Sequence, residues 1–498
     1  MLSLELRGVA DAEIRGRVCD FFRVSFLPLR IFVYFCAGGR TAGVIRDTTP
    51  MQLPKDFDSY FRERWRDEDV AALVAGLDGE PSVSIRVNPK RLPPEAEPEG
   101  ADGRVPWCPE GFYLKQRPVF TADPLLHAGA YYVQEASSMF LAHVVRTILH
   151  SSFFTLRCQA ALDLCAAPGG KSTLLRSLLP DDCRLVSNEP NRVRAQVLAE
   201  NMAKWGHPNV VVTQAYAADI AHAIGKTGFA QRPFDLILAD VPCSGEGMMR
   251  KEAEAVAQWS PSFVAECAAL QRSIVSDIWP ALRAGGILIY STCTFNPEED
   301  EENVEWIARE LGAEMIPIPV EPSWGIRGDM RKEREIQDIK YKIQDIRAHQ
   351  SSIINHPFCH FLPGQVRGEG FFMAVLRKHG TEESDSEDYA ESPKALKRKK
   401  KERRKGNGDA APALTVLPTD VLDEAGAPRV ELSLEEAIRY LQREALVLPA
   451  ETPRGIVQVC FRGQRLGLMK NLGTRANNLY PKEWRIRSGY AIPHTLFA

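Results

Sequence analysis

Two cysteines follow apolar segments at points where buried strands are expected to end. Cys243 follows Phe234–Ala239 in the run Asp240-Val-Pro-Cys-Ser-Gly-Glu-Gly247, and Cys293 follows Ile287–Ser291 in the run Ser291-Thr-Cys-Thr294. One cysteine near a strand end is usually a small core residue. Two of them at the ligand-binding ends of two strands, one beside an aspartate and a proline turn, indicate thiol chemistry at an active site.

A glycine-rich turn precedes both cysteines in the chain. It joins a predicted strand, Ala161–Cys165, to a predicted helix, Ser172–Leu179, and reads Asp163-Leu-Cys165-Ala166-Ala167-Pro168-Gly169-Gly170-Lys171-Ser172. Two glycines let the backbone approach a ligand closely, and the start of a helix offers free N–H groups. The turn matches neither G-x-x-x-x-G-K nor G-x-G-x-x-G, and alone a Gly-Gly turn is tight loop chemistry as often as a ligand site.

Glu189 stands at the end of the next predicted strand, Leu185–Ser187. A carboxylate at this place, after a glycine turn on the preceding strand, suits the two hydroxyls of a ribose. From its position alone, Glu189 could equally be the N-cap of the next helix, Val193–Trp205. The pairing with the glycine turn favours a nucleoside ligand.

The elements that must position these residues form a regular alternation. Short apolar strands, which also include Val210–Thr213, alternate with helices such as Ser262–Leu282, and Gly368–Arg377 is predicted to be a late strand. Buried strands that alternate with helices indicate βαβ units and a mostly parallel sheet. Such sheets bind ligands at the carboxyl ends of their strands, which is where the two cysteines, the glycine turn and Glu189 lie.

The whole set of motifs resembles one known family. DLCAAPGGKS, NEPNRVRAQVLAENMAKWG, FDLILADVPCSGEGMMRK and LIYSTCTFNPEEDEENV are similar to the Sun-type RNA 5-methylcytosine methyltransferases. From Met51 the chain resembles their bacterial small-subunit-rRNA (RsmF-like) branch, over residues 51–320 and 356–378 and, more loosely, 430–498. The resemblance implies an α/β fold of the class I S-adenosylmethionine (SAM)-dependent type, Rossmann-like, with a small α+β N-terminal domain and a PUA-like C-terminal domain.

The resemblance also implies roles for the two cysteines. Carbon 5 of cytosine is a weak nucleophile, and a thiolate that adds at carbon 6 makes it enamine-like. In this family the cysteine of TCT attacks and that of PCSG assists release, which assigns attack to Cys293 and release to Cys243. DNA cytosine methyltransferases attack with a Pro-Cys cysteine, so the residues alone leave the reverse assignment open. Asp240 is expected to hydrogen-bond the cytosine N3/N4 edge, for which it would need a bound proton.

For SAM, the resemblance assigns a set of binding residues and leaves one position open. The turn Cys165–Lys171 takes the methionine and ribose end, Glu189 the ribose hydroxyls, and Asp240 also borders the cofactor. The family has an acid near the adenine after the third strand; here Tyr216 occupies its place, and Asp219 follows three residues later. Either residue could serve. Tyr131–Ser138 matches a segment near the cofactor but could also be a plain strand-to-helix cap.

The domain boundaries follow from composition and charge. We expect an extension at 1–50 that is disordered or not native, since Met51 starts like a domain; a real, packed extension is the alternative. An N-terminal RNA-binding-like domain at 51–150 and a methyltransferase domain at 151–380, with a charged helical insertion at about 327–355, then precede a disordered linker at 381–413 and the PUA-like domain at 414–498. Residues 394–405 carry nine basic side chains and 452–498 carry eight, although the net charge of the whole chain is −3.

These features predict the partners and exclude several function classes. The basic C-terminal segments, with Phe461, Tyr480 and Trp484 among arginines such as Arg465, suit RNA phosphates and bases, although each aromatic residue alone is more typical of a core. Arg250-Lys251 suits another phosphate, although two adjacent basic residues on a loop are more often simply solvated. Removing 394–498 should then weaken the salt dependence of RNA binding and leave SAM binding intact. The eleven cysteines form no C-x-x-C pair, so we expect no metal, a reducing cytoplasmic setting, no membrane span and a monomer.

The resemblance implies methylation of cytosine carbon 5 in RNA, and its RsmF-like branch implies small-subunit rRNA as the substrate. A tRNA substrate is the alternative, as is a non-catalytic ribosome assembly factor, which the presence of both Cys243 and Cys293 disfavours. An exocyclic-amine methyltransferase is also disfavoured, because Asp240-Val-Pro-Cys lacks the second proline and the aromatic residue of the motif that those enzymes use.

Overall fold

The computed structural model describes residues 52–150, 157–224, 232–332, 353–380, 414–487 and 495–497, with the side chain of residue 150 left out. The predicted extension at 1–50, the predicted linker at 381–413 and the middle of the predicted insertion at 327–355 lie outside the described residues. Within the described ranges, no helix combines the length and the apolar character that a membrane span requires.

The central sheet contains the predicted strands, and their order in the sheet differs from their order in the chain. Five adjacent strands are parallel to one another: β5 (Ala160–Asp163), β6 (Arg184–Asn188), β7 (Val210–Gln214), β8 (Phe234–Asp240) and β9 (Leu282–Thr292). β14 (Phe371–Lys378) runs antiparallel to β9, and it pairs with β10 (Ala313–Met315) and β13 (Cys359–Phe361). The order is β10-β14-β9-β8-β5-β6-β7-β15. Strands are added on one side of β5 up to β7 and on its other side from β8 onward, and such sheets bind ligands at the point where the order switches.

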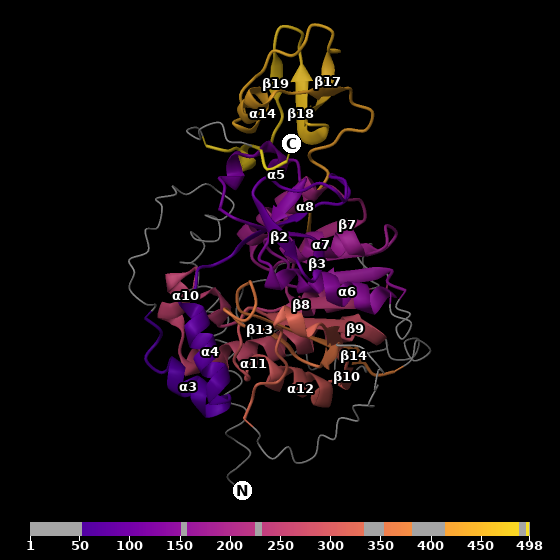
Figure 1. Ribbon diagram of the computed structural model, residues 1–498. Helices are drawn as coiled ribbons and strands as arrows, with labels where there is room; N and C mark the ends of the chain where they lie inside the picture. Colours follow the sequence, from indigo (N-terminus) through magenta and orange to yellow (C-terminus); the bar gives the residue numbers. More distant parts are fainter. Residues whose placement is uncertain are drawn as a thin grey trace.

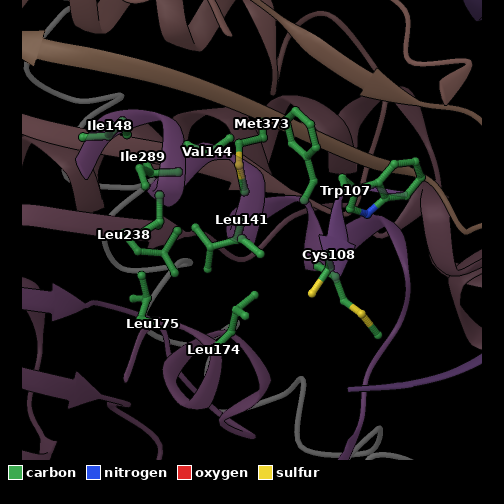
Figure 2. Close-up of a cluster of buried hydrophobic side chains, with 14 of the residues drawn as sticks. Trp107, Cys108, Leu141, Val144, Ile148, Leu174, Leu175, Leu238, Ile289 and Met373 are labelled. Carbon is green, nitrogen blue, oxygen red and sulfur yellow. The ribbon is translucent and has the colours of Figure 1, made fainter. Parts of the chain in front are cut away.

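Helices cover both faces of this sheet, because the strands carry apolar side chains on both faces. On one face pack α6 (Leu141–His150), α7 (Gly170–Leu178) and α8 (Arg192–Trp205), and Figure 2 shows Leu141, Leu174 and Leu175 against Leu238 and Ile289 of the sheet. On the other face pack α9 (Ala217–Ala223), α11 (Pro261–Ile278) and α12 (Glu301–Glu310), against neighbours that include Ile237 and Leu288. Successive strand residues point to opposite faces, and both faces are apolar.

The start and end of α11 follow from its sequence. Ser260 accepts a hydrogen bond from the Phe263 N–H, and Pro261 holds the first helical position, which suits a residue that lacks an N–H group. The predicted end at Leu282 is wrong: the helix stops at Ile278, a short 3-10 turn contains Pro280, and Leu282 already belongs to β9. A proline inside this segment cannot continue the helical hydrogen bonds.

The N-terminal part divides into two units that pack at different places. A four-stranded antiparallel sheet contains β1 (Val83–Val87), β2 (Ala101–Val105), β3 (Cys108–Leu114) and β4 (Tyr131–Val133). The helices α3 (Phe57–Arg64) and α4 (Asp67–Leu77) form a separate core with the loops that follow β8 and β9, through Trp259 and Phe295. Figure 1 shows α3 and α4 at one end of the molecule, beside α10 (Ala253–Gln258), and the C-terminal domain at the other.

The C-terminal domain shares its core with the N-terminal sheet. Its own sheet has the order β16-β17-β18-β19, formed by Arg429–Glu431, Gly455–Phe461, Gln464–Asn471 and Ala476–Asn478, and α14 (Leu434–Leu441) packs on it. Ile85 and Phe112 from the N-terminal sheet belong to the same buried cluster as Val459 and Leu466. The short helix α5 (Pro124–His127) lies at this junction (Figure 1). β15 (Thr415–Leu417) pairs instead with β7 on the edge of the central sheet.

The ends of the predicted insertion are not an exposed helix. Arg327 exchanges backbone hydrogen bonds with His360, and Met330 is fully buried in the core that α3 and α4 share. At the other end, β12 (Ile354–His356) pairs with β11 (Ile318–Val320). Short 3-10 turns occur at Phe120–Ala122, Ser137–Phe140, Glu246–Met248, Trp279–Ala281, Pro322–Trp324 and Lys482–Trp484.

Candidate active site

The structure brings Cys243 and Cys293 together. Asp240 at the end of β8 pairs in register with Ser291 of β9, so the loops after these strands start side by side. The two sulfur atoms lie 3.1 Å apart, and the Cys293 N–H points at the Cys243 sulfur across 3.3 Å. Both side chains remain partly exposed. The arrangement places two thiols within reach of one ligand atom.

The environment of this pair keeps a proton on one sulfur. The hydrogen bond with Cys293 and burial raise the pKa of the Cys243 thiol well above its usual range. Two sulfur atoms this close cannot both ionise easily, because the second charge would face the first. A protonated Cys243 can therefore donate to a Cys293 thiolate, which is the nucleophilic form of a cysteine.

Lys171 and Asp240 form an ion pair beside the two thiols. The ammonium of Lys171 donates to one carboxylate oxygen of Asp240 at 2.8 Å, and the Ser291 hydroxyl donates to the other at 2.7 Å. Burial lowers the pKa of Lys171, but the neighbouring Asp240 charge and hydrogen bond raise it more, so the net shift is upward. Lys171 was expected in the cofactor turn, and its pairing with Asp240 is not evident from the sequence.

The glycine turn lies where the sequence analysis placed it, between β5 and α7. Gly169 is the N-cap of α7 and has a φ of +117°, which favours glycine. A Cβ at Gly170 would lie 3.3 Å from the Tyr132 ring, so the predicted segment Tyr131–Ser138 does pack against the turn. One carboxylate oxygen of Asp163, at the end of β5, is buried without a hydrogen-bond partner among the described residues. An acceptor is thus left over beside the turn.

Glu189 is buried at the end of β6 and is not a helix cap. The N-cap of α8 is Asn191, whose side chain accepts from two N–H groups of the first turn. One oxygen of Glu189 accepts from the Asn191 N–H at 2.9 Å, and Arg194 lies 3.4 Å from the other. Burial raises the pKa of Glu189. The N-cap alternative is therefore wrong.

The adenine end keeps both predicted candidates. Tyr216 precedes α9 and is 47% exposed. Asp219 lies in the first turn of that helix, and its N–H donates to the Tyr216 carbonyl at 3.0 Å. Cys165, in the glycine turn, is packed closely enough that burial raises its pKa well above the usual range.

Two predicted RNA contacts are structural instead. Arg250 is 7% exposed and pairs with Glu369 at 2.7 Å, while Lys251 lies 3.1 Å from the other oxygen of Glu369. Arg465 is also buried, and it donates to the Ala203 carbonyl at the end of α8. Neither guanidinium is available to a phosphate in this structure.

The aromatic residues proposed for base stacking are part of the C-terminal core. Phe461 and Tyr480 are buried there, and Trp484 packs against the same core. They therefore stabilise the domain, and the basic residues around them are left as its candidate RNA contacts.

Two buried carboxylates that were not predicted from the sequence lie between the cysteine loops, Glu246 and Glu299. Both occur inside motifs that were quoted for their cysteines, and a glutamate among small residues after a strand end was the available signal. Across the described ranges, no group of three or more His, Cys, Asp or Glu side chains could hold a metal ion.

The strand order, the antiparallel strand after β9, the glycine turn after β5 and the acid after β6 define the class I methyltransferase fold. Residues 157–377 match the model for the 16S rRNA methyltransferase RsmB/F family, residues 53–136 that for the N-terminal domain of 16S rRNA methyltransferase RsmF, and residues 427–486 that for the methyltransferase RsmF PUA domain. Over these residues the chain is similar to the RsmB/F family and to the N-terminal and PUA domains of its RsmF members.

Two relatives and one solved structure illustrate the similarity. "Ribosomal RNA small subunit methyltransferase F" of Pectobacterium carotovorum is 31% identical over 347 residues, and that of Cronobacter sakazakii is 33% identical over 345 residues. Each match covers 66% of this chain and 63% of the relative, so the chain spans just under two thirds of these relatives. The crystal structure of PH0851 has a TM-score of 0.50 and 20% identity over 66% of both chains, and it supports the fold.

Proposed function

We propose that this protein transfers a methyl group from SAM to carbon 5 of a cytosine in RNA, with small-subunit rRNA as the substrate. The observation that carries the proposal is the pair of sulfur atoms 3.1 Å apart at the carboxyl ends of β8 and β9, beside the Lys171–Asp240 ion pair. Carbon-5 methylation needs one thiol to activate the base and a second group to help release it. A core cysteine would need neither the second thiol nor the partly buried ion pair.

The residues around the glycine turn fit SAM. The turn Cys165–Lys171 leads into the start of α7, where backbone N–H groups are available to a ligand, and Asp163 has an unused acceptor there. Glu189 would hold the ribose hydroxyls, and Asp219 or Tyr216 the adenine. SAM, when bound, supplies an electrophilic methyl group. A fit of this kind predicts that Glu189→Ala loses SAM affinity in a direct titration, whatever its activity.

We assign attack to Cys293 and release to Cys243. The Cys293 thiolate adds to carbon 6, and the adjacent protonated Cys243 stabilises that thiolate before attack. After methylation the carbon-5 proton must pass to a base as the bond between Cys293 and carbon 6 breaks and the Cys293 thiolate leaves; Cys243, once it has lost its own proton to solvent, would be that base. Family resemblance gives the same assignment.

Asp240 acts as an acceptor in this proposal. Lys171 donates to one of its oxygens and Ser291 to the other. Asp240 would also accept a hydrogen bond from the N4 amino group of cytosine, and Lys171 would hold Asp240 in place through the hydrogen bond that it donates. The basic C-terminal segments would hold the RNA backbone.

Tritium release tests the reaction directly. RNA that carries 5-tritiated cytosine should lose tritium to water only when SAM is present, because substitution at carbon 5 displaces that hydrogen. A methyltransferase that acts on an exocyclic amine would methylate without tritium release, and an assembly factor would do neither. Small-subunit rRNA and tRNA are compared as substrates in the same assay.

Covalent adducts test the two cysteine roles. Cys243→Ala should accumulate an RNA–protein adduct that survives denaturing electrophoresis, and Cys293→Ala should form none. An adduct in Cys293→Ala and none in Cys243→Ala would reverse the assignment. Cys267→Ala, which changes a buried thiol of α11 outside the pair and outside the proposed cofactor turn, is the matched control and should form no lasting adduct.

A further inference from the structure

The loop that carries Cys243 reaches across to the loop that carries Cys293 through a buried carboxylate. Glu246 lies three residues after Cys243 and is fully buried. It accepts from the N–H groups of Phe295 at 3.0 Å and Asn296 at 3.1 Å, and from the Thr294 hydroxyl. The backbone of the second loop is therefore held, directly after Cys293, by a side chain of the first.

The second loop returns the same contact to the first. Glu299 is fully buried and accepts from the N–H of Ser244, the residue after Cys243, at 3.0 Å. Gln271 of α11 donates at 2.6 Å to the same carboxylate and at 2.9 Å to the carbonyl of Pro242, the residue before Cys243. The backbone on both sides of Cys243 is thus tied to Glu299.

One amide joins the two carboxylates. The side-chain NH₂ of Asn296 donates to Glu246 at 3.0 Å and to Glu299 at 2.7 Å. We call Glu246, Asn296 and Glu299 the clasp. Each glutamate belongs to one cysteine loop and binds the backbone of the other, so neither loop can shift without breaking bonds made by both.

The clasp holds two acids close together in the interior, which is costly. Burial raises the pKa of Glu246, and burial followed by the charge of Glu246 raises the pKa of Glu299 to about 8. An apolar filling would stabilise this region at least as well. A requirement for fixed loop geometry explains why carboxylates are present here.

We propose that Glu246 and Glu299 are positioning residues that hold Cys243 and Cys293 at their separation of 3.1 Å. The inference rests on the proposed function only for its effect on catalysis. The separation of the sulfur atoms can be measured without RNA or SAM, so the two proposals can fail independently.

The first variant is Glu299→Gln. Its amide oxygen can keep the bonds from Ser244 and Gln271, but its NH₂ group then faces the NH₂ of Asn296 and breaks the link to Glu246. The matched control is Glu301→Gln, two residues later. Glu301 is equally buried but pairs with His360 at 3.0 Å, away from both cysteine loops. Glu246→Gln is the second variant, in case one substitution prevents folding, and thermal melting reports the fold of each.

Disulfide closure reports the separation of the two thiols. A Cys293 thiolate attacks the disulfide of oxidised glutathione, which forms a mixed disulfide and releases one reduced glutathione. The deprotonated Cys243 then attacks the Cys293 sulfur of the mixed disulfide and releases the second glutathione. In total, two electrons pass from the protein to glutathione. Because the sulfur atoms already lie 3.1 Å apart, the natural protein should close without a lasting mixed disulfide. Cys158 and Cys183 are 3.5 Å apart but buried, so they should stay reduced in every folded variant, and peptide mapping of this pair reports that the fold is intact.

We expect Glu299→Gln and Glu246→Gln to accumulate the mixed disulfide and to close at least about ten-fold more slowly. Their turnover in tritium release should fall by at least the same factor, with SAM affinity and KM for RNA within about two-fold of the natural protein. Glu301→Gln should match the natural protein in all of these. Closure and turnover in the folded clasp variants that equal those of Glu301→Gln would overturn the proposal. Tritium release absent from the natural protein would refute the proposed function and leave the closure rates to decide the clasp.

Discussion

Replacing Arg250 with methionine would separate a structural role from an RNA contact. The Arg250 guanidinium donates to Glu369 at 2.7 Å and to the Gly368 carbonyl at 2.7 Å, and it lies against the carbonyls at the end of α4. The Arg250 side chain is 5% exposed and that of Glu369 is 1% exposed. Arg250→Met fills a similar volume but leaves a buried carboxylate with Lys251 as its remaining cation.

The size of the effect follows from that burial. Removing one partner of a buried ion pair costs about 3–5 kcal/mol, and the remaining contact with Lys251 places the expected loss at the lower limit, about 3 kcal/mol. For a domain of about 150–250 residues, each kcal/mol lost from the free energy of unfolding lowers the melting temperature by about 2–4 °C, so a decrease of roughly 6–12 °C is expected. Lys251→Met should cost less, about 1 kcal/mol, because Arg250 continues to hold Glu369.

Thermal melting and RNA binding at several salt concentrations are the two measurements. The double variant Arg250→Met/Glu369→Gln should recover part of the lost stability, because no unpaired buried charge remains. The salt dependence of RNA binding should be unchanged in folded Arg250→Met. An unchanged melting temperature together with a log–log salt slope smaller by about 0.7, the value for one phosphate contact with single-stranded RNA, would refute the structural role of Arg250.

Three further predictions concern pH, the shared core and the linker. Burial raises the pKa of Asp163 to about 7, so its contribution to stability is present below its unfolded pKa of about 4 and is lost as the pH rises to about 7; Asp163→Asn should flatten this part of the pH–stability curve, and an unchanged curve would contradict the assignment. Phe497→Ala, at a side chain that is 4% exposed, should cost about 3 kcal/mol, whereas the control Leu479→Ala, at 43% exposure, should change the melting temperature little. Changing the nine basic residues of 394–405 to glutamine should reduce the salt slope of RNA binding without altering SAM affinity, and an unchanged slope would remove the linker as an RNA contact.

The sequence was informative where local pattern determines structure. Apolar runs fixed the strands, and the ends of β8 and β9 then placed Cys243 and Cys293 at one edge, since neighbouring parallel strands end together. The Gly169 turn was visible because only glycine readily takes that backbone conformation.

Partners distant in sequence were invisible to the same reasoning. Glu299 belongs to the acidic run PEEDEE, which looks like a solvated helix start, yet its partner Ser244 is 55 residues away. Arg250 looked like a loop cation because Glu369, 119 residues further on, carries no signal of the contact. Burial of a charged side chain depends on such long-range pairing, which a single sequence does not reveal.

The shared core also changes what removal of residues 394–498 would test. Phe497 packs against the Tyr131 ring at 5.7 Å, and the Leu496 N–H donates to Asp123, which also accepts from Tyr131. Tyr131 precedes Tyr132, whose ring lies against Gly170 of the proposed cofactor turn. The deletion would therefore uncover the apolar face of the N-terminal sheet and loosen the support of the glycine turn, so we expect it to weaken SAM binding as well as RNA binding. Neutralising 394–405 in the full chain leaves this support in place, and a loss of SAM affinity in the deletion but not in the neutralised chain would show that the C-terminal domain stabilises the catalytic domain in addition to any contact with RNA.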